Sequence, residues 1–349
     1  MVTIQEIARK AKVSPSTVSR ALHNPSLVKM ETRKRILKIS QKNNYICNVL
    51  ARGLITQKSK TLGLLIPTIM HSIFASSVKG IQDCAEEKGY QIIFGNTDYK
   101  MEREQKLINL LMERRVDGII LHGLTIDKDT LCKFQKNKFP LLVTWDIGMD
   151  GDVDMVSYDD FKSAYKAIEF LIHLGHRRIS MIVGPFAASG RAVWRWKAYK
   201  KCLQAHGIPY DAKLVVQRTH TLSNGQEVMA ELLQRECTAV LCGSDALAIG
   251  VMKAIQEAGL KVPHDISVMG YTDSEYSILT NPPLTTIRLP SYELGKLATE
   301  ILISRIQGKL KEYQKHILNT ELVIRGSTGP AKGAKTATLV AKLAEAPLQ

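Results

Sequence analysis

Four polar side chains near the N-terminus have the types and spacing to contact nucleic acid. They are Ser16, Thr17, Ser19 and Arg20, and they surround apolar positions that recur at helical spacing. On one helix these polar residues would face outwards. Hydroxyl groups bind phosphate oxygens, and an arginine fork binds the major-groove edge of guanine. The segment therefore has the chemistry to read DNA.

The positive charge of the chain is concentrated in the same region. Residues 1–60 contain 13 Lys and Arg residues and two acidic residues, so they carry +11 of the formal net charge of +15. Residues 61–330 carry only +2. A basic block on one compact segment, followed by a near-neutral remainder, is typical of a phosphate-binding module attached to another domain. We therefore expect double-stranded DNA as a partner.

Two short helices would position these side chains. Thr3 and Glu6 predict a capping box at the start of the first helix. Ser14 is a suitable N-cap for the second helix, with Pro15 at its first position, where a missing N–H costs nothing. A third helix is expected from about residue 31 to residue 43. The first two helices predict a helix-turn-helix, although a generic three-helix bundle with a solvated basic face has the same pattern.

Residues 47–60 are expected to form a hinge helix and a linker. Their N-x-L-A-R-G-L run (48–54) is too short to be helical by itself in water. A helix that forms only against DNA would suit the apolar Leu54 beside Arg52, with the leucine wedged between base steps in the minor groove. The alternative is a plain linker whose leucines cap the next domain.

The rest of the chain alternates strand and helix patterns, which predicts an α/β fold with parallel sheets. A first series of strands is expected at 62–66, 91–94, 118–121 and 141–144, and a second at 155–157, 179–183, 214–216, 239–241 and 266–269. Two series predict two doubly wound lobes, with ligands beyond the carboxyl ends of the strands. The expected domains are a helix-turn-helix head (1–46), the hinge (47–60), a two-lobed body (61–330) and a loose tail (331–349).

Polar residues recur at the predicted strand ends, where a ligand of this fold would bind. They are Asp146, Asp159, Asp160, Arg191, Arg195, Ser244, Asp245 and Asp273. Arg191 and Arg195 are four residues apart, so they share one face at the start of a predicted helix. Arginine forks suit a carboxylate, and aspartates accept hydrogen bonds from hydroxyls. The set predicts a small hydroxylated acid as effector, although each residue alone could be a helix cap or part of a surface ion pair.

Several classes of function are disfavoured. The chain has no G-x-G-x-x-G, G-x-x-x-x-G-K-[ST] or G-x-S-x-G motif, and its six cysteines show no C-x-x-C spacing. We therefore expect no enzyme activity, no cofactor and no metal site. No run of about 18 apolar residues and no signal peptide are present. A cytoplasmic protein without membrane contact is expected.

Several motifs in a fixed order together resemble the lactose/galactose-repressor (LacI/GalR) family of transcription factors over about residues 1–328. They are V-S-P-S-T-V-S-R-A-L (13–22), N-V-L-A-R-G-L (48–54), T-L-G-L-L-I-P (61–67), R-V-D-G-I-I-L (115–121), L-G-H-R-R-I (174–179), G-L-K-V-P-H-D-I-S-V-M-G-Y (259–271) and P-P-L-T-T-I (282–287). The resemblance implies a homodimer on a palindromic operator. It also implies a periplasmic-binding-protein-like body whose small-molecule effector shifts the affinity for DNA.

The resemblance also assigns roles to individual residues. Pro15, Ser16 and Arg20 fall at base-reading positions, Thr17 and Ser19 at phosphate positions, and Leu54 at the minor-groove lever; Thr3, Asn48 and Ala51 complete the expected DNA-binding set. Phe74, Asp146, Arg195, Ser244, Asp245 and Asp273 fall at or beside effector positions. Cys47 stands where the family usually has proline, and Ser244 replaces the usual asparagine. The second departure weakens any transfer of a neutral-sugar specificity.

Within the family, three segments look most like the gluconate-utilisation repressors. They are D-Y-K-M-E-R-E-Q (98–105), R-A-V-W-R-W-K-A-Y (191–199) and H-T-L-S-N-G-Q-E (220–227). The leading hypothesis is therefore a repressor controlled by a sugar acid such as gluconate. A sugar- or purine-responsive regulator of the same family is the alternative. A two-lobed transport receptor and a cytoplasmic carbohydrate enzyme are less favoured.

Overall fold

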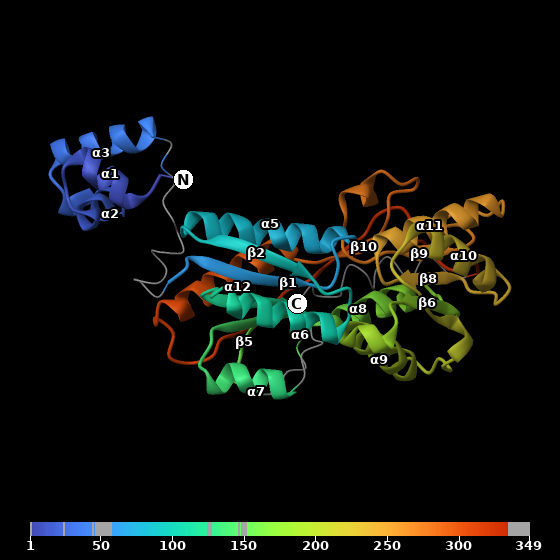
Figure 1. Cartoon of the computed structure of the whole chain (residues 1–349). Coiled ribbons are helices and arrows are strands. Elements are labelled where there is room, and N and C mark those ends of the chain that lie inside the picture. Colours follow the sequence, from blue (N-terminus) through green and yellow to red (C-terminus); the bar gives the residue numbers. More distant parts are fainter. Residues whose placement is uncertain are drawn as a thin grey trace. The chain divides into compact units, whose positions relative to one another are not determined.

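The computed structural model describes residues 2–23, 25–43, 45, 58–123, 128–145, 147 and 152–333. The chain divides into two compact units, Met1–Ser59 and Lys60–Gln349, which we call the head and the body (Figure 1). The predicted hinge residues Asn48, Ala51 and Leu54 lie outside the described residues, as do Asp146 and the tail from residue 334. In the described part of the chain, no helix is both long enough and apolar enough to cross a membrane.

The head contains three α-helices around a small apolar core. They are α1 (Ile4–Ala11), α2 (Pro15–His23) and α3 (Met30–Lys42), with a 3-10 turn at Pro25–Leu27. The predicted capping box is confirmed, because Thr3 Oγ1 accepts from Glu6 N at 3.3 Å and Thr3 N donates to Glu6 Oε2 at 3.4 Å. Ile7, Val18 and Ile36, one from each helix, are fully buried. This core leaves the polar face of α2 on the surface.

The first lobe of the body is built on a six-stranded parallel sheet in the order β11-β5-β4-β3-β1-β2. Its strands are β1 (Thr61–Ile66), β2 (Gln91–Asn96), β3 (Gly118–His122), β4 (Leu141–Thr144), β5 (Asp154–Tyr158) and β11 (Lys315–Leu318). Helices α5 (Ser72–Glu87) and α12 (Ser291–Ile306) cover one face, and α6 (Met101–Glu113) and α7 (Lys128–Lys136) cover the other. Leu64 packs towards the first pair and Leu65 towards the second, as expected for a strand buried on both faces.

The second lobe has a four-stranded parallel sheet in the order β7-β6-β8-β9. Its strands are β6 (Ile179–Val183), β7 (Val215–Gln217), β8 (Ala239–Cys242) and β9 (Ser267–Met269). Helices α8 (Asp160–His173) and α9 (Gly190–Ala205) cover one face, and α10 (Leu222–Leu233) and α11 (Asp245–Glu257) cover the other. The predicted two-lobed α/β architecture with parallel sheets is therefore confirmed.

One strand was assigned to the wrong lobe by the sequence pattern. Residues 155–157 were predicted to begin the second series, but β5 pairs with β4 in the first sheet, with Val143 opposite Met155. The chain therefore enters the second lobe only after β5, through α8. The pattern of apolar residues identifies a strand but carries no information about which sheet it joins.

The segment after residue 270 was not predicted as regular structure. It forms β10 (Thr286–Arg288) and β12 (Glu321–Val323), which pair antiparallel, and it also supplies α12 and β11 to the first lobe. Helix α12 is buried on most of its surface and packs closely against α5. A Cβ atom on Gly295 would lie 2.1 Å from the carbonyl oxygen of Ser77, so glycine permits this approach. A helix buried on most sides has no clear amphipathic stripe.

Candidate functional site

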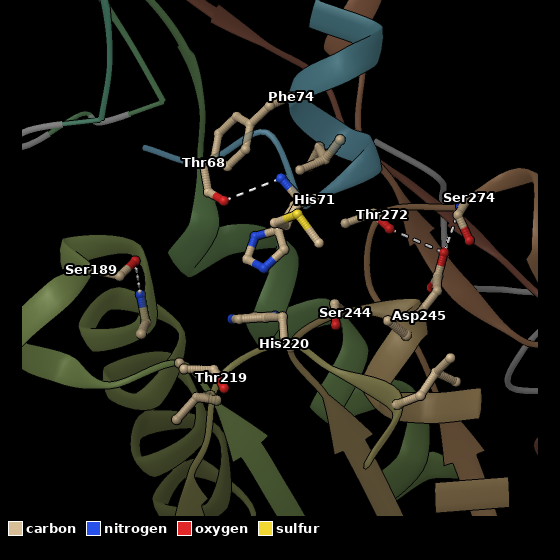
Figure 2. A pocket seen from close by; sticks show the side chains of 18 of the residues that line it. Thr68, His71, Phe74, Ser189, Thr219, His220, Ser244, Asp245, Thr272 and Ser274 are labelled. Atoms are coloured by element: carbon tan, nitrogen blue, oxygen red, sulfur yellow. Dashed lines mark hydrogen bonds between the residues drawn. The ribbon is translucent and has the colours of Figure 1, made fainter. Parts of the chain in front are cut away.

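A cavity of about 910 Å³ lies in the body and is lined by residues of both lobes (Figure 2). Thr68 and Gly184 follow β1 and β6, and Gly243 follows β8, so three parallel strands direct their carboxyl ends towards it. A cavity is thus found at the strand ends, where a ligand of this fold is expected to bind. The volume is within the range of small-molecule sites in proteins.

Arg195 lines the cavity, but its charge is taken up by a buried carboxylate. Its Nε donates to Asp160 Oδ1 at 2.6 Å, and the two side chains are only 8% and 4% exposed. Its guanidinium also donates to the carbonyl of Gly243 at 3.1 Å and lies 3.6 Å from the centre of the Tyr271 ring. Burial alone would lower the pKa of Arg195, but Asp160 offsets burial and holds the pKa above its ordinary value. Arg195 therefore joins α8 and α9 structurally.

Arg191 lies one helical turn earlier and has a different environment. Its guanidinium is 5.2 Å from the centre of the Trp145 ring and 5.6 Å from that of Phe74. It donates a long hydrogen bond of 3.5 Å to the Tyr158 hydroxyl. Among the described residues, Arg191 forms no salt bridge. Of the two predicted arginines, Arg191 is thus the one whose charge is available to a ligand.

Aromatic side chains of the first lobe form the wall on which Arg191 lies. Phe74 and Trp145 are buried, with ring centres 5.4 Å apart, and His122 lies behind them. The His122 ring is fixed between Ser77 Oγ at 3.0 Å and Thr144 Oγ1 at 2.6 Å. Burial, followed by the charge of Arg191, lowers the pKa of His122 to about 3, so this imidazole is neutral. The wall contributes ring faces rather than charge.

Ser244 and Asp245 line the cavity at the start of α11. Ser244 is the N-cap and accepts from Leu247 N at 3.3 Å. The buried Asp245 carboxylate accepts from Thr286 Oγ1 at 2.6 Å, from Thr272 Oγ1 at 3.1 Å and from Ser274 N at 2.5 Å. A carboxylate offers about four acceptor positions. Asp245 therefore stabilises the second lobe through three hydrogen bonds. About one acceptor position remains for a hydroxyl group of a ligand.

Asp273 is not brought together with the other predicted effector residues. It does not line the cavity, and its carboxylate binds Arg325 and Arg288, both at 2.7 Å. Burial would raise the pKa of Asp273, but the two arginines hold it below its ordinary value. Its place in the structure is that of an ion pair inside the second lobe. Asp159, another acid of the strand-end set, caps α8 by accepting from Lys162 N at 2.8 Å.

Two histidines in the cavity were not singled out from the sequence. His71 directly precedes α5 in the first lobe, and His220 lies between β7 and α10 in the second. Their ring centres are 5.4 Å apart, and both line the cavity (Figure 2). The sequence feature that points to His220 is a glycine directly after each of two strands. Gly184 and Gly243 have no side chain, and this leaves room for the His220 ring.

Besides α11, whose N-cap is Ser244, three more helices present their N-termini at the cavity. The lining residues His71 and Ser189 are the N-caps of α5 and α9, and Leu222 is the first residue of α10. Helix N-termini carry partial positive charge and free N–H groups, which favour anions. In the described part of the chain no group of His, Cys, Asp and Glu residues could hold a metal ion. The helix N-termini thus add partial positive charge to that of Arg191 at the cavity.

In the head, the structure places most of the predicted DNA-contacting residues on one exposed helix. Pro15, Ser16 and Arg20 are exposed, and Thr17 and Ser19 are half-buried. Ser14 Oγ lies 2.8 Å from the hydroxyls of both Ser16 and Thr17 and accepts from Thr17 N at 3.2 Å, which orders the first turn of α2. Thr3 is part of the α1 cap. The arrangement leaves Arg20 directed away from the core.

Comparisons with known proteins match both units. Residues 3–48 match the family model described as "Bacterial regulatory proteins, lacI family", and residues 168–328 match the "Periplasmic binding protein-like domain". The HTH-type transcriptional repressor CytR of Escherichia coli K12 is 32% identical over 328 residues, covering 93% of this chain and 96% of CytR. The match therefore includes the head and both lobes.

Solved structures show the same architecture. The Lac repressor dimer bound to operator and the anti-inducer ONPF superposes with a TM-score of 0.85 at 27% identity, over 94% of this chain and 99% of that chain. The transcription regulator GntR from Chromobacterium violaceum gives a TM-score of 0.73 at 25% identity, over 77% of this chain and 99% of that chain.

Proposed function

The chain belongs to the lacI family of bacterial regulatory proteins, and we propose that it is a repressor whose operator affinity is set by a small hydroxylated acid. Its relatives are transcriptional regulators and not enzymes, so the chain is a regulator with a DNA-binding head and an effector-binding body. The effector, by this proposal, is gluconate or a close sugar acid. The protein acts on DNA in the cytoplasm.

The observation that carries the proposal is the difference between Arg191 and Arg195. Asp160 neutralises Arg195, whereas Arg191 reaches the cavity without a carboxylate partner among the described residues. A ligand carboxylate on Arg191 would complete a charge-assisted hydrogen bond. The N-termini of α5, α9 and α10 add partial positive charge at the same cavity. A neutral sugar would leave this cationic group unpaired.

The hydroxyl groups of such a ligand have acceptors and donors in the second lobe. Asp245 retains about one acceptor position, and Thr272, Ser274 and Ser244 line the same wall. Phe74 closes the site on the opposite side with an apolar ring. The cavity therefore offers one cationic end, a polar wall and an aromatic wall, which suits a polyhydroxylated acid.

The DNA-binding part of the proposal concerns a homodimer on a palindromic operator. Arg20, Ser16 and Pro15 read bases in the major groove, and Thr17 and Ser19 contact phosphates, with Thr3 at the start of α1. The exposure of Arg20 and the basic surface of the head support this assignment. Asn48, Ala51 and Leu54, which lie outside the described residues, are proposed to contact the minor groove.

The test is calorimetry on the full chain with gluconate, glucose and a purine nucleoside. Gluconate should bind, and Arg191→Gln should weaken it by about 30-fold or more, because losing one partner of a buried charged pair costs about 2–5 kcal/mol. Lys197→Gln is the matched control, since Lys197 is exposed on the same helix. A gel shift with operator-like palindromes should respond to gluconate in the wild type and the control only. Tight binding of glucose or the nucleoside, with no binding of any sugar acid, would refute the carboxylate site.

A further inference from the structure

The two lobes of the body meet inside the cavity through a pair of histidines. His71 comes from the start of α5 in the first lobe and His220 from the segment before α10 in the second, with ring centres 5.4 Å apart. Both rings are half-buried, and within the described residues neither imidazole makes a hydrogen bond. Figure 2 shows the two labelled side chains next to each other, with Phe74 beyond His71. The pair is therefore a direct contact between the two lobes. Its ring nitrogens are available to bind a ligand.

The His220 ring is held in place by the ends of two neighbouring strands. A Cβ atom on Gly184, after β6, would lie 2.9 Å from His220 Nε2. A Cβ atom on Gly243, after β8, would lie 3.0 Å from His220 Cε1. A side chain at Gly184 would require the ring to shift, and one at Gly243 would leave a contact tighter than most Cβ atoms make. The fold thus builds a specific seat for an imidazole at the carboxyl edge of the second sheet.

Charged and titratable groups surround the pair from every packed element. Arg191 and Arg195 come from α9, Asp160 from α8, Tyr158 from β5, His122 from β3, Asp98 and Tyr99 from the segment before α6, Asp245 from α11, and Tyr276 from the 3-10 segment Glu275–Ile278. The three acids are engaged: Asp160 by Arg195, Asp98 by Arg103, and Asp245 by Thr272, Thr286 and Ser274. Asp146 lies outside the described residues. The cationic side chain nearest the pair without a described acid is Arg191.

The surroundings of both histidines favour the neutral form of the imidazole. Burial, together with His71, Arg195 and Arg191, lowers the pKa of His220 to about 3. Burial, followed by the charge of Arg191, also lowers the pKa of His71. The causes are the same in both cases, because burial disfavours the charged imidazole and the positive charge of Arg191 disfavours it further. An anion placed between Arg191 and the pair would reverse that condition.

We propose that His71 and His220 complete the anion site of Arg191, so that the acid group of the effector bridges the two lobes and its binding is accompanied by proton uptake on the histidine pair. This inference rests on the proposed function, since it concerns the same cavity and the same class of ligand. It adds two specificity-determining residues and a dependence on pH. With one histidine on each lobe, the bound anion draws the lobes together.

The pH dependence has a definite sign. A histidine whose pKa rises on ligand binding takes up a proton with the ligand, so the affinity increases as the pH falls. For one proton, the increase is at most about tenfold per pH unit. A ligand held by Arg191 alone would show no such dependence between pH 8 and pH 6. The sign therefore separates a clamp that includes the histidines from a simple arginine site.

The first experiment needs no knowledge of the natural effector. The imidazole signals of the full chain are followed by NMR from pH 8 to pH 5 in sodium chloride and in sodium sulfate at equal ionic strength. His71→Gln and His220→Gln assign the two signals, and the exposed His264 serves as reference. In chloride the His220 signal should not titrate in this range, because its pKa is about 3. Sulfate should raise both midpoints towards the upper end of about 1–3 pH units, the effect of an opposite charge at close range, and so bring the His220 midpoint above pH 5. Arg191→Gln should reduce that rise, and Lys197→Gln should leave it unchanged.

The second experiment applies the same question to gluconate. Calorimetry at pH 6.5 in two buffers of different ionisation enthalpy measures the protons taken up per ligand bound. The wild type should take up a measurable fraction of a proton, and the variant carrying both His71→Gln and His220→Gln should take up none. This double variant should also lose the increase in affinity between pH 8 and pH 6. Gln keeps polar groups at both positions, and the wild-type measurement does not depend on the variant folding.

The outcomes separate the two proposals. If sulfate raises both midpoints but gluconate does not bind, the inter-lobe anion site stands and the sugar acid is wrong. If gluconate binds through Arg191 with no proton uptake, and sulfate moves neither midpoint, the histidine clamp is overturned and the proposed function stands. If sulfate raises both midpoints and gluconate binds through Arg191 with proton uptake, the results support both proposals.

Discussion

The head and the body place their cationic side chains in opposite surroundings. In the head, every Lys and Arg from Arg9 to Lys42 is exposed, and no salt bridge is found among the described residues from 2 to 43. In the body, four arginines are paired with three aspartates that are at most 8% exposed: Arg195 with Asp160, Arg305 with Asp154, and Arg288 and Arg325 with Asp273. The positive charge of the head is therefore accessible to an external partner, whereas these arginines of the body form ion pairs that stabilise the fold.

The difference decides what each kind of cation can do. Exposed charges act over about 8–10 Å and are screened by salt, so they suit the attraction and release of a polyanion. Buried charges act only at contact, but removing one partner leaves the other uncompensated in a medium of low polarity. Of the two arginines that line the cavity, Arg191 is the exception, because it is partly buried without a described carboxylate. That exception is why we assign ligand binding to Arg191 and not to Arg195.

The largest effect is expected when the buried pair of the body is broken. Asp160→Ala should lower the free energy of unfolding of the body by about 3–5 kcal/mol, because Arg195 is left buried and unpaired. The loss should be the same at low and high salt. Denaturant unfolding at two salt concentrations measures it. A matched control is Asp83→Ala, which removes the partner of the exposed Lys79 and should cost less than about 1 kcal/mol.

The double variant Asp160→Ala with Arg195→Met gives a further check. It removes both charges, so it should recover much of the stability that Asp160→Ala loses. If the single variant is as stable as the wild type, or if its loss of stability disappears in high salt, the Asp160–Arg195 pair is not shielded from solvent. The contrast drawn between head and body would then be wrong.

A smaller effect is expected for a single exposed arginine of the head. Arg20→Ala should weaken operator binding by about 1–3 kcal/mol and relax the preference at one base pair, because Arg20 is proposed to read a base edge. Lys34→Ala is the matched control, an exposed cation on α3 that is expected to act only through the salt-dependent attraction. Binding assays on the operator and on single-base variants at several salt concentrations distinguish the two. Equal loss on every sequence would show that Arg20 contacts phosphate only.

Much of the architecture could be predicted because local patterns determine it. The capping box at Thr3 and the strands 141–144 and 179–183 are found where the sequence places them. Strand β11 escaped prediction because its residues alternate between exposed and half-buried positions, without the apolar run of a central strand. The prediction that β5 belongs to the second lobe was also wrong, because strand pairing depends on contacts between residues that are distant in the sequence.

The site was predictable in its residue types but not in its pairings. The spacing of Arg191 and Arg195 places both on one helix face, yet Asp160, 35 residues before Arg195, decides which of them is neutralised. Asp273 carries the same chemistry as Asp245, but Arg288 and Arg325 engage it away from the cavity. Single histidines in polar segments give no local signal, and His71 meets His220 only when two lobes assemble. Tertiary contacts, rather than residue types, make these distinctions.

The smallest effect on ligand affinity is expected from the aromatic rings of Phe74 and Trp145, which lie beside Arg191 where a counterion would otherwise be expected. The cations of the head from Arg9 to Lys42 are exposed, whereas the Arg191 guanidinium lies 5.6 Å from the centre of the Phe74 ring and 5.2 Å from that of Trp145. A cation–ring contact contributes about 0.5–1 kcal/mol where it is partly exposed. Phe74→Leu keeps the site apolar and leaves Trp145 in place, so gluconate binding should weaken by less than about fivefold. Calorimetry measures this loss, which should be far below that of Arg191→Gln. A loss as large as that of Arg191→Gln would mean that the aromatic wall, and not the charge of the arginine, dominates recognition in the body.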